Sequence, residues 1–190
     1  VLWDFNTYVS MLAPPITFEI NGIQYVSIMT GTGGGDLFSG APIDPVAKPA
    51  SLIHSNTGRL LVFSLGGEES LPTPTVRDVT IPEQQLAEAS QDDLARGEVL
   101  YHDFCAPCHG LVARSGGVIA DLRRMSQGSH DSFDAIVLEG VLAGTGMAAF
   151  DDALTPDDTQ LIHDYVKARA HEDREVALGN KSDARLTWQK

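Results

Sequence analysis

The sequence predicts a mixed fold, in which an antiparallel β region at residues 1–67 precedes an all-α region at residues 91–172. Three observations lead to this prediction. β-branched and aromatic residues alternate in the first region, prolines interrupt residues 68–90, and apolar residues recur at three- and four-residue steps in the last region. The middle stretch is expected to be an extended linker, because proline breaks both helix and sheet hydrogen bonding.

Four strands are expected in the β region. The alternating run Ile16–Ile20 is followed by Asn21-Gly22, a strong hairpin signal because both turn positions need positive φ. Ile23–Met29 then returns as the partner strand. Arg59–Leu65 is a further strand, and Val1–Phe5 is the remaining candidate.

Helices are expected from residue 91 onward. Ser90 is expected to cap the first helix, and Thr155 is expected to cap the last, with Pro156 in the first turn. A shorter helix is expected at residues 131–142. Residues 173–190 are polar and are expected to form a frayed tail.

Composition and charge restrict the kind of protein. The 43% content of hydrophobic residues is sufficient for a packed core, and the formal net charge of −13 argues against binding to nucleic acid or to an anionic membrane surface. No apolar stretch is long enough to span a bilayer. The chain begins at Val1 rather than at methionine, so we interpret it as a mature chain or a fragment without an export signal.

Both cysteines of the chain belong to the motif Cys105-Ala106-Pro107-Cys108-His109, which has the C-x-x-C-H spacing of c-type haem attachment. Two thiols at this spacing can add to two vinyl groups on one porphyrin edge, and the next residue then presents an imidazole to the iron. A redox C-x-x-C motif is expected in a βαβ context, which the surrounding pattern does not show. Two buried thiols beside a surface histidine are the other alternative. We therefore predict a covalent haem that transfers electrons.

A methionine opposite histidine raises the reduction potential of haem iron, and the chain has four methionines. Met147 is the expected sixth ligand, because it lies in a glycine-rich loop before the last helix and glycines allow close approach to a haem face. Its alternative role is to fill a gap in the core. Met125 follows the haem motif, whereas Met11 and Met29 are expected in the core of the β region.

The histidines outside the motif are not favoured over the methionine as iron ligands. His102 and His163 lie on predicted helices in polar surroundings, and both are expected at the surface. His130 lies in a turn, where the pattern assigns it no role.

Residues 90–170 resemble class I cytochrome c, and the whole chain resembles the C-terminal part of the quinohaemoprotein alcohol dehydrogenases. These enzymes join a β-propeller that binds pyrroloquinoline quinone (PQQ) to a C-terminal cytochrome c domain. The resembling stretches follow the order of that family and lie at residues 1–5, 13–26, 58–67, 101–110, 115–118, 121–123 and 146–150.

The resemblance implies that residues 1–67 are the terminal strands of the propeller, with Trp3 in a packing motif, and that residues 91–172 are the cytochrome c domain. In that family the catalytic base, the Ca²⁺ ligands and most PQQ contacts lie earlier in the chain. No catalytic residue is therefore expected here, and this chain alone could not oxidise an alcohol. Its first partner would be the upstream propeller blades of the same enzyme.

Carried over by position, Cys105 and Cys108 would hold the haem, and His109 and Met147 would ligate its iron. The chain would accept electrons one at a time from reduced PQQ and pass them to an external acceptor, which could be a small cytochrome, a copper protein or a quinone. A bacterial, periplasmic location is implied.

Two further sets of residues take a role from the resemblance. The first and last helices of small cytochromes c cross tightly, which gives Gly97 and Tyr165 a joint role, unless Gly97 is an incidental helical glycine. Arg123 and Arg124 could pair with haem propionates, because guanidinium groups match carboxylates, or they could be ordinary surface arginines.

The sequence departs from the family at two positions. The family usually has proline at the position of Ala120, whose carbonyl can orient the ligand histidine, and alanine keeps that carbonyl with less rigidity. The glycine cluster after the hairpin usually includes a tryptophan where Thr32 stands here, which puts any PQQ contact from the loop at residues 32–35 in doubt.

Two other functions remain as alternatives. The first is a stand-alone periplasmic cytochrome c that carries electrons and has an unrelated β extension. It is less favoured, because such a carrier would not need strands with open pairing edges. The second is a haem sensor, which Met147 argues against because a sixth ligand closes the iron to gases.

Overall fold

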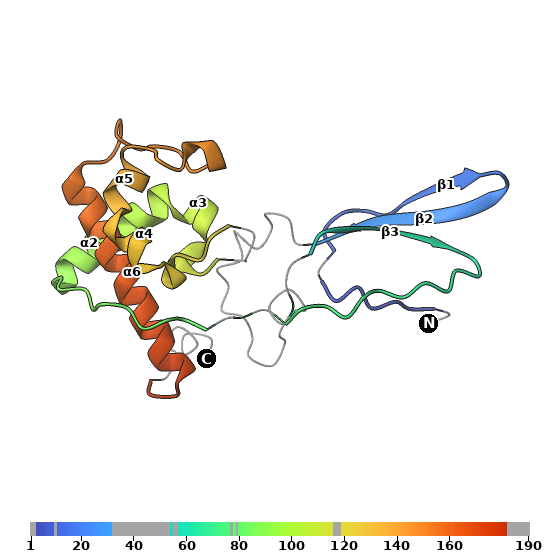
Figure 1. The fold of residues 1–190 in the computed structure, drawn as a ribbon, viewed down its shortest axis with the longest axis horizontal. Helices are drawn as coiled ribbons and strands as arrows, with labels where there is room; N and C mark the ends of the chain where they lie inside the picture. The colour runs from blue at the N-terminus through green and yellow to red at the C-terminus, as the bar shows by residue number, and fades with distance from the viewer. Residues whose placement is uncertain are drawn as a thin grey trace. The chain divides into compact units, whose positions relative to one another are not determined.

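The chain divides into two compact units, residues 1–79 with 116–118 and residues 80–115 with 119–190. The structure is a computed structural model, and it describes residues 3–9, 11–31, 54, 57–76, 78, 80–115 and 119–181. The first unit is built of strands and the second of helices (Figure 1). The predicted mixed fold is confirmed.

The first unit contains a three-stranded antiparallel sheet with the strand order β1-β2-β3. Its strands are β1 (Ile16–Ile20), β2 (Ile23–Thr30) and β3 (Arg59–Ser64). Asn21 and Gly22 join β1 to β2 with φ of 53° and 78°. These positive values are those of the predicted tight hairpin turn, which is confirmed.

The strand expected at Val1–Phe5 is not confirmed. Val1 and Leu2 lie outside the described residues, and residues 3–5 pair with none of the described strands. The rings of Trp3 and Phe5 instead contact Phe63 of β3, with centroids 5.1 and 5.2 Å from it. Ring packing can place a segment against a sheet, but a strand also needs a hydrogen-bonded neighbour. The loop at residues 32–35 also lies outside the described residues.

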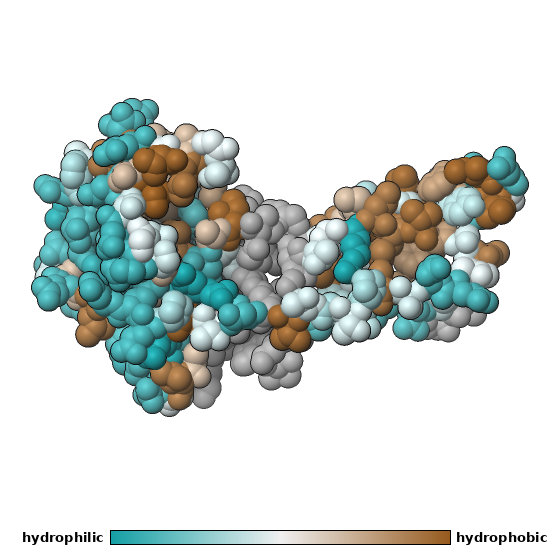
Figure 2. Space-filling view, in the orientation of Figure 1, coloured by the Kyte–Doolittle hydropathy of each residue, from teal (hydrophilic) through white to brown (hydrophobic). Residues whose placement is uncertain are grey.

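Much of the apolar surface of the sheet is exposed. Ile16 and Leu60 are each 61% exposed, and Met11 and Met29, which were expected in the core, are 49% and 52% exposed. Strand side chains alternate between the two faces, so a sheet needs a second layer to bury an apolar face. The described residues provide too little of one, and Figure 2 shows apolar residues gathered over the strands.

The second unit is organised around two long helices, α2 (Gln91–Phe104) and α6 (Pro156–Ala177). The hydroxyls of Ser90 and Thr155 cap them as predicted, each accepting a backbone N–H three residues on. Short helices connect them: α3 (Ala106–His109), η2 (Leu111–Ala113), η3 (Leu122–Arg124), α4 (Gln127–Asp131), α5 (Phe133–Val137) and η4 (Ala143–Thr145). None of the helices in the described ranges is long and apolar enough to cross a bilayer.

The crossing of α2 and α6 explains the glycine in the middle of α2. A Cβ added to Gly97 would lie 2.2 Å from the carbonyl oxygen of Leu161 and 3.1 Å from the Cβ of Tyr165. Only glycine lets the two helix backbones approach this closely. The joint role of Gly97 and Tyr165 is therefore confirmed, and Gly97 is not incidental.

The structure corrects the bounds of two expected helices, the short one at residues 131–142 and the last one. The helix expected at residues 131–142 is much shorter, because α5 covers only Phe133–Val137. Ser132, with a φ of −106° and a ψ of 16°, separates α5 from α4, which ends at Asp131. The chain after α5 then turns, and the Phe150 N–H donates to the carbonyl of Val137 at 2.8 Å. Helix α6 continues past Glu172 to Ala177, so the tail does not fray there.

The stretch at residues 68–90 contains neither helix nor strand where the structure describes it. Its last part nevertheless belongs to the helical unit. Ile81 is 9% exposed, and Gln84 Nε2 donates to the carbonyl of Arg123 at 2.6 Å. The domain boundaries proposed from sequence remain predictions.

Candidate haem site

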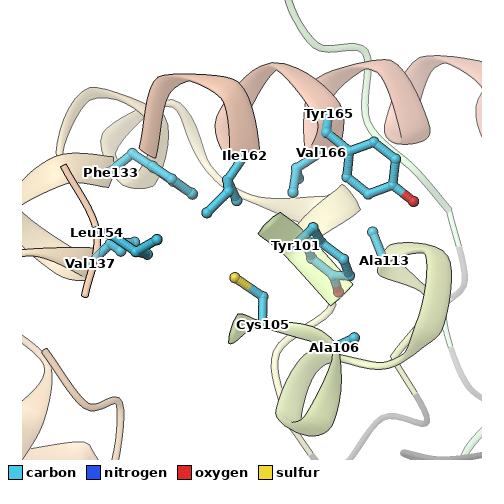
Figure 3. Close-up of a cluster of buried hydrophobic side chains, with 10 residues drawn as sticks. All are labelled: Tyr101, Cys105, Ala106, Ala113, Phe133, Val137, Leu154, Ile162, Tyr165 and Val166. Carbon is cyan, nitrogen blue, oxygen red and sulfur yellow. The ribbon is translucent and has the colours of Figure 1, made fainter. Parts of the chain in front are cut away.

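The two cysteines lie on one short helical turn that follows α2 directly. Cys105 lies between α2 and α3 as the C-cap of the first and the N-cap of the second, and the His109 N–H donates to the Cys105 carbonyl at 2.8 Å. Cys105 is buried, whereas Cys108 is exposed. Figure 3 shows the Cys105 sulfur directed toward the side of the apolar cluster that contains Val137, Leu154 and Ile162.

The surroundings of Cys105 do not suit thiol–disulfide exchange. Burial, and secondarily the neighbouring Cys108, raise the pKa of the Cys105 thiol to about 12. The thiolate is the nucleophile in disulfide exchange, so a buried thiol with a raised pKa reacts poorly. This observation argues against the redox C-x-x-C alternative and leaves a sulfur that faces an apolar interior.

The imidazole of His109 is oriented by a hydrogen bond to Ala120. The residue is 7% exposed, and its Nδ1 lies 2.9 Å from the carbonyl oxygen of Ala120. A carbonyl oxygen can only accept, so Nδ1 is the donor, and the neutral imidazole with this tautomer has its lone pair on Nε2. This second contact is how proteins fix the tautomer of a metal-binding histidine. Ala120 thus supplies the carbonyl that a proline usually supplies at this position in the quinohaemoprotein family discussed above.

Met147 and Met125 are the two methionines of the helical unit. Both are partly buried and pack against the apolar cluster. Met147 follows η4, in a stretch whose neighbours on both sides are exposed. Met125 follows η3, and its carbonyl lies 3.5 Å from Gln84 Nε2. The choice of Met147 as the iron ligand remains a prediction.

These groups fit a covalently bound haem. A C-x-x-C-H turn presents a buried cysteine, an exposed cysteine and an imidazole whose Nδ1 is hydrogen-bonded, beside an apolar cluster that two methionines contact. The donors are sulfur and nitrogen, as haem iron and thioether attachment require. Groups of three or more His, Cys, Asp or Glu that could hold another metal do not occur among the described residues.

The prediction that His102 and His163 are ordinary surface residues is wrong, because both are partly buried and engaged. His102 Nδ1 lies 2.7 Å from the Glu98 carbonyl, and its Nε2 accepts the Val112 N–H at 3.3 Å. The second contact is notable because Val112 has a φ of 51°, which is strained for a β-branched residue.

His163 of α6 stacks on the rings of His130 from α4 and Phe133 from α5. Its ring lies parallel to that of Phe133, with centroids 4.4 Å apart, and its Nε2 lies 2.7 Å from Nδ1 of His130. Burial, and secondarily the nearby Lys167, lower the pKa of His163 to about 4. Burial and Lys167 also lower the pKa of His130. Both imidazoles are therefore neutral at neutral pH.

Arg123 is not an ordinary surface residue, whereas its pairing with a haem propionate remains a prediction. Its guanidinium donates to both oxygens of Asp121, at 2.9 and 2.6 Å, and to Asp173 at 2.8 Å. Arg124 is exposed. Nothing in the sequence pattern singles out Asp173, which is 5% exposed and also binds Arg114 and Arg169. Only the four-residue spacing of Arg169 and Asp173 on one helix could have indicated part of this cluster.

Comparison with known proteins places the helical unit in a cytochrome family. The family described as "Cytochrome C oxidase, cbb3-type, subunit III" matches residues 92–166. The matched range begins in α2, ends in α6 and includes the C-x-x-C-H motif and Met147. Residues 116–118, which belong to the resembling stretch at residues 115–118, lie outside the described residues.

Three relatives extend the likeness over nearly the whole chain. Quinohemoprotein alcohol dehydrogenase ADH IIB of Pseudomonas putida is 39% identical over 90% of this chain and 24% of its own length. The dehydrogenase subunit of the alcohol dehydrogenase (quinone) of Gluconobacter oxydans is 36% identical over 95% of this chain and 24% of its own. The structure of ADHIIG from Pseudomonas putida HK5 superposes with a TM-score of 0.76 and 29% identity, covering 99% of this chain and 26% of that one.

A fourth comparison supports the fold alone, since the quinohemoprotein alcohol dehydrogenase of Comamonas testosteroni gives a TM-score of 0.62 at 24% identity. The chain spans about a quarter of the length of the curated relatives it matches. It therefore corresponds to the C-terminal, cytochrome-containing part of the quinohaemoprotein alcohol dehydrogenases, a part whose chemistry is haem-mediated electron transfer.

Proposed function

We propose that this chain is the electron-transfer end of a PQQ-dependent quinohaemoprotein alcohol dehydrogenase of the bacterial periplasm. The bound haem supplies one-electron redox chemistry, which suits a two-electron quinol that must be reoxidised in single steps. Ca²⁺ and PQQ belong to the complete enzyme, and an alcohol is its substrate. The external acceptor is a small cytochrome, a copper protein or a quinone.

Four residues of the chain hold the haem in this proposal. Cys105 and Cys108 would form the thioether bonds, and His109 through Nε2 and Met147 through its sulfur would ligate the iron. The observation that carries the proposal is the hydrogen bond from His109 Nδ1 to the Ala120 carbonyl at 2.9 Å. It leaves Nε2 as the only ring nitrogen able to bind a metal, directly after two cysteines at attachment spacing.

The β unit has a different role in the proposal. Its strands pack against further propeller strands of the complete enzyme, and this packing covers the apolar side chains that are exposed here, including Ile16 and Leu60. The proposal thus accounts for both units, whereas a stand-alone carrier leaves the exposed sheet unexplained.

Spectroscopy of the oxidised, haem-loaded chain tests the ligand assignment. Methionine ligation gives a weak near-infrared sulfur-to-iron band, which we expect to disappear in Met147→Ala together with a fall in the reduction potential. Met125→Ala is the matched control, because both methionines pack on the same cluster, and it should keep the band. If the band instead survives in Met147→Ala and is lost in Met125→Ala, the assignment is wrong.

A further inference from the structure

The contact that orients His109 comes from Ala120, a residue that lies in neither a helix nor a strand. Ala120 lies between η2 and η3, and its carbonyl meets the imidazole across eleven residues of sequence. Alanine does not restrict its own backbone as proline does. Contacts made by neighbouring residues must therefore hold the Ala120 carbonyl in place if the imidazole of His109 is to keep one orientation.

The buried carboxylate of Asp173 binds one arginine before Ala120 and one after it. Arg114, before Ala120, donates from Nε and Nη2 to the two oxygens of Asp173, at 3.0 Å each. Arg123, after Ala120, donates from Nη1 to Asp173 Oδ2 at 2.8 Å. The Asp173 side chain is only 3% exposed. Two points of the chain on either side of Ala120 are thereby fixed to the last helix.

The cluster also reaches the peptide next to Ala120. Asp121 accepts two hydrogen bonds from the guanidinium of Arg123, and its Oδ1 also lies 3.2 Å from the Arg123 backbone nitrogen. Arg123 therefore joins Asp173 to the residue that directly follows Ala120. Paired guanidinium and carboxylate groups of this kind are geometrically specific, because two parallel hydrogen bonds fix both planes.

Asp173 is ionised in this setting. Burial by itself would raise its pKa, but the hydrogen bonds from Arg114, the charge of Arg169 and the contact with Arg123 together hold the pKa below its ordinary value. A buried charge that loses a partner is strongly penalised, so the cluster resists partial opening. It is thus a rigid support rather than an adaptable surface network.

We propose that Asp173 is a positioning residue for the axial histidine: through Arg114 and Arg123 it fixes the Ala120 carbonyl, and this carbonyl fixes the tautomer and ring plane of His109 toward the haem iron. The inference rests on the proposed function, because it takes His109 as an iron ligand. In this chain the Asp173 cluster provides the rigidity that a proline at position 120 would otherwise provide.

Hydrogen exchange at His109 Nδ1 tests the proposal directly. In the reduced, haem-loaded full chain, proton NMR would follow exchange of the Nδ1 proton, referred to backbone amides of α2. Asp173→Asn should accelerate it by about tenfold or more relative to those amides. Asp164→Asn is the matched control: it removes the same charge from a buried position on α6 that pairs with Lys167 and Gln160 instead, and it should leave the exchange rate unchanged.

A second variant keeps the test decisive if Asp173→Asn does not accumulate with haem. Arg114→Gln removes one flank of the support at a side chain that is 27% exposed, and it should give a smaller acceleration in the same direction. If the Nδ1 proton of His109 exchanges at the wild-type rate in the haem-loaded form of either variant, the positioning role is overturned. An equally large acceleration in Asp164→Asn would also overturn it. A wild-type chain that does not retain haem covalently would instead overturn the proposed function.

Discussion

The two units of the chain solve the problem of burial differently. In the helical unit Tyr101, Ile162 and Val166 are completely inaccessible to solvent, and the helices that carry them cross at a glycine. In the β unit the sheet is correctly paired, yet Ile16 and Leu60 each remain 61% exposed. Good local structure is therefore present in both units, but among the residues that the structure describes only those of the helical unit form a core cluster.

This difference teaches that backbone pairing and stability are separate properties. Three strands can form the ladders between them by themselves, whereas covering their apolar faces requires a second layer. Each buried square ångström of apolar surface contributes roughly 25 cal/mol, and the exposed faces forgo this contribution. We therefore expect the two units to behave differently when they are separated.

Separation of the units should give the largest effect. Residues 80–190, expressed with haem attachment, should fold with a cooperative thermal transition, because the core, the haem-motif residues and the Gln84 contact all lie within them. Residues 1–79 should aggregate or show no cooperative transition by circular dichroism. A cooperative, monomeric melt of residues 1–79 would contradict the comparison and favour a carrier with an independent β domain.

The helix crossing gives the next largest effect. Gly97→Ala should destabilise the helical unit by about 2 kcal/mol, because overpacking costs more than the helix propensity gained from alanine. The shift in the urea midpoint measures it. Gly128→Ala is the control within α4, where an added Cβ would meet only the Ser126 hydroxyl, at 3.8 Å. An equal effect of the two substitutions would show that the crossing does not support the core.

The smallest expected effect is the loss of stability that protonation of His163 causes at acid pH. The pKa of His163 is lowered to about 4 in the folded chain, whereas an unfolded histidine titrates near 6.5. Between these values the unfolded chain binds more protons, so this residue's contribution is fully present above about pH 6.5 and is lost as pH falls toward 4. Because His163 is partly exposed, we expect only about 1 kcal/mol.

Comparison with His163→Phe isolates this contribution from the carboxylates that titrate in the same range. The phenyl ring can keep the stack on Phe133, and the variant should lose less stability than the wild type between pH 6.5 and 4.5, as measured by urea unfolding. Identical pH profiles would show that the partly buried imidazole is as easily protonated in the folded chain as in the unfolded one.

Local signals predicted much of the structure. The hairpin at Asn21-Gly22, the caps Ser90 and Thr155, and the tight position of Gly97 each depend on near neighbours or on one strong steric constraint. The C-x-x-C-H motif likewise carries its chemistry within five residues. Such features can be read from sequence because few alternatives satisfy them.

Features that depend on distant partners could not be predicted. Arg123 was assigned to the surface or to a propionate, because nothing in its neighbourhood indicated Asp173, fifty residues away. His163 was expected in solvent, and the rings of His130 and Phe133 that cover it come from other elements. Met11 and Met29 were expected to be buried, since periodicity shows which side chains share a face but not whether anything covers that face.

The central claim is that this chain carries one haem covalently through Cys105 and Cys108. Mass spectrometry of the denatured chain after acid-acetone extraction tests it most directly. We expect the measured mass to exceed that of the polypeptide by one haem, and we expect this excess to be absent from the Cys105→Ala/Cys108→Ala double variant. A mass equal to that of the polypeptide alone, with the colour in the extract, would contradict the account.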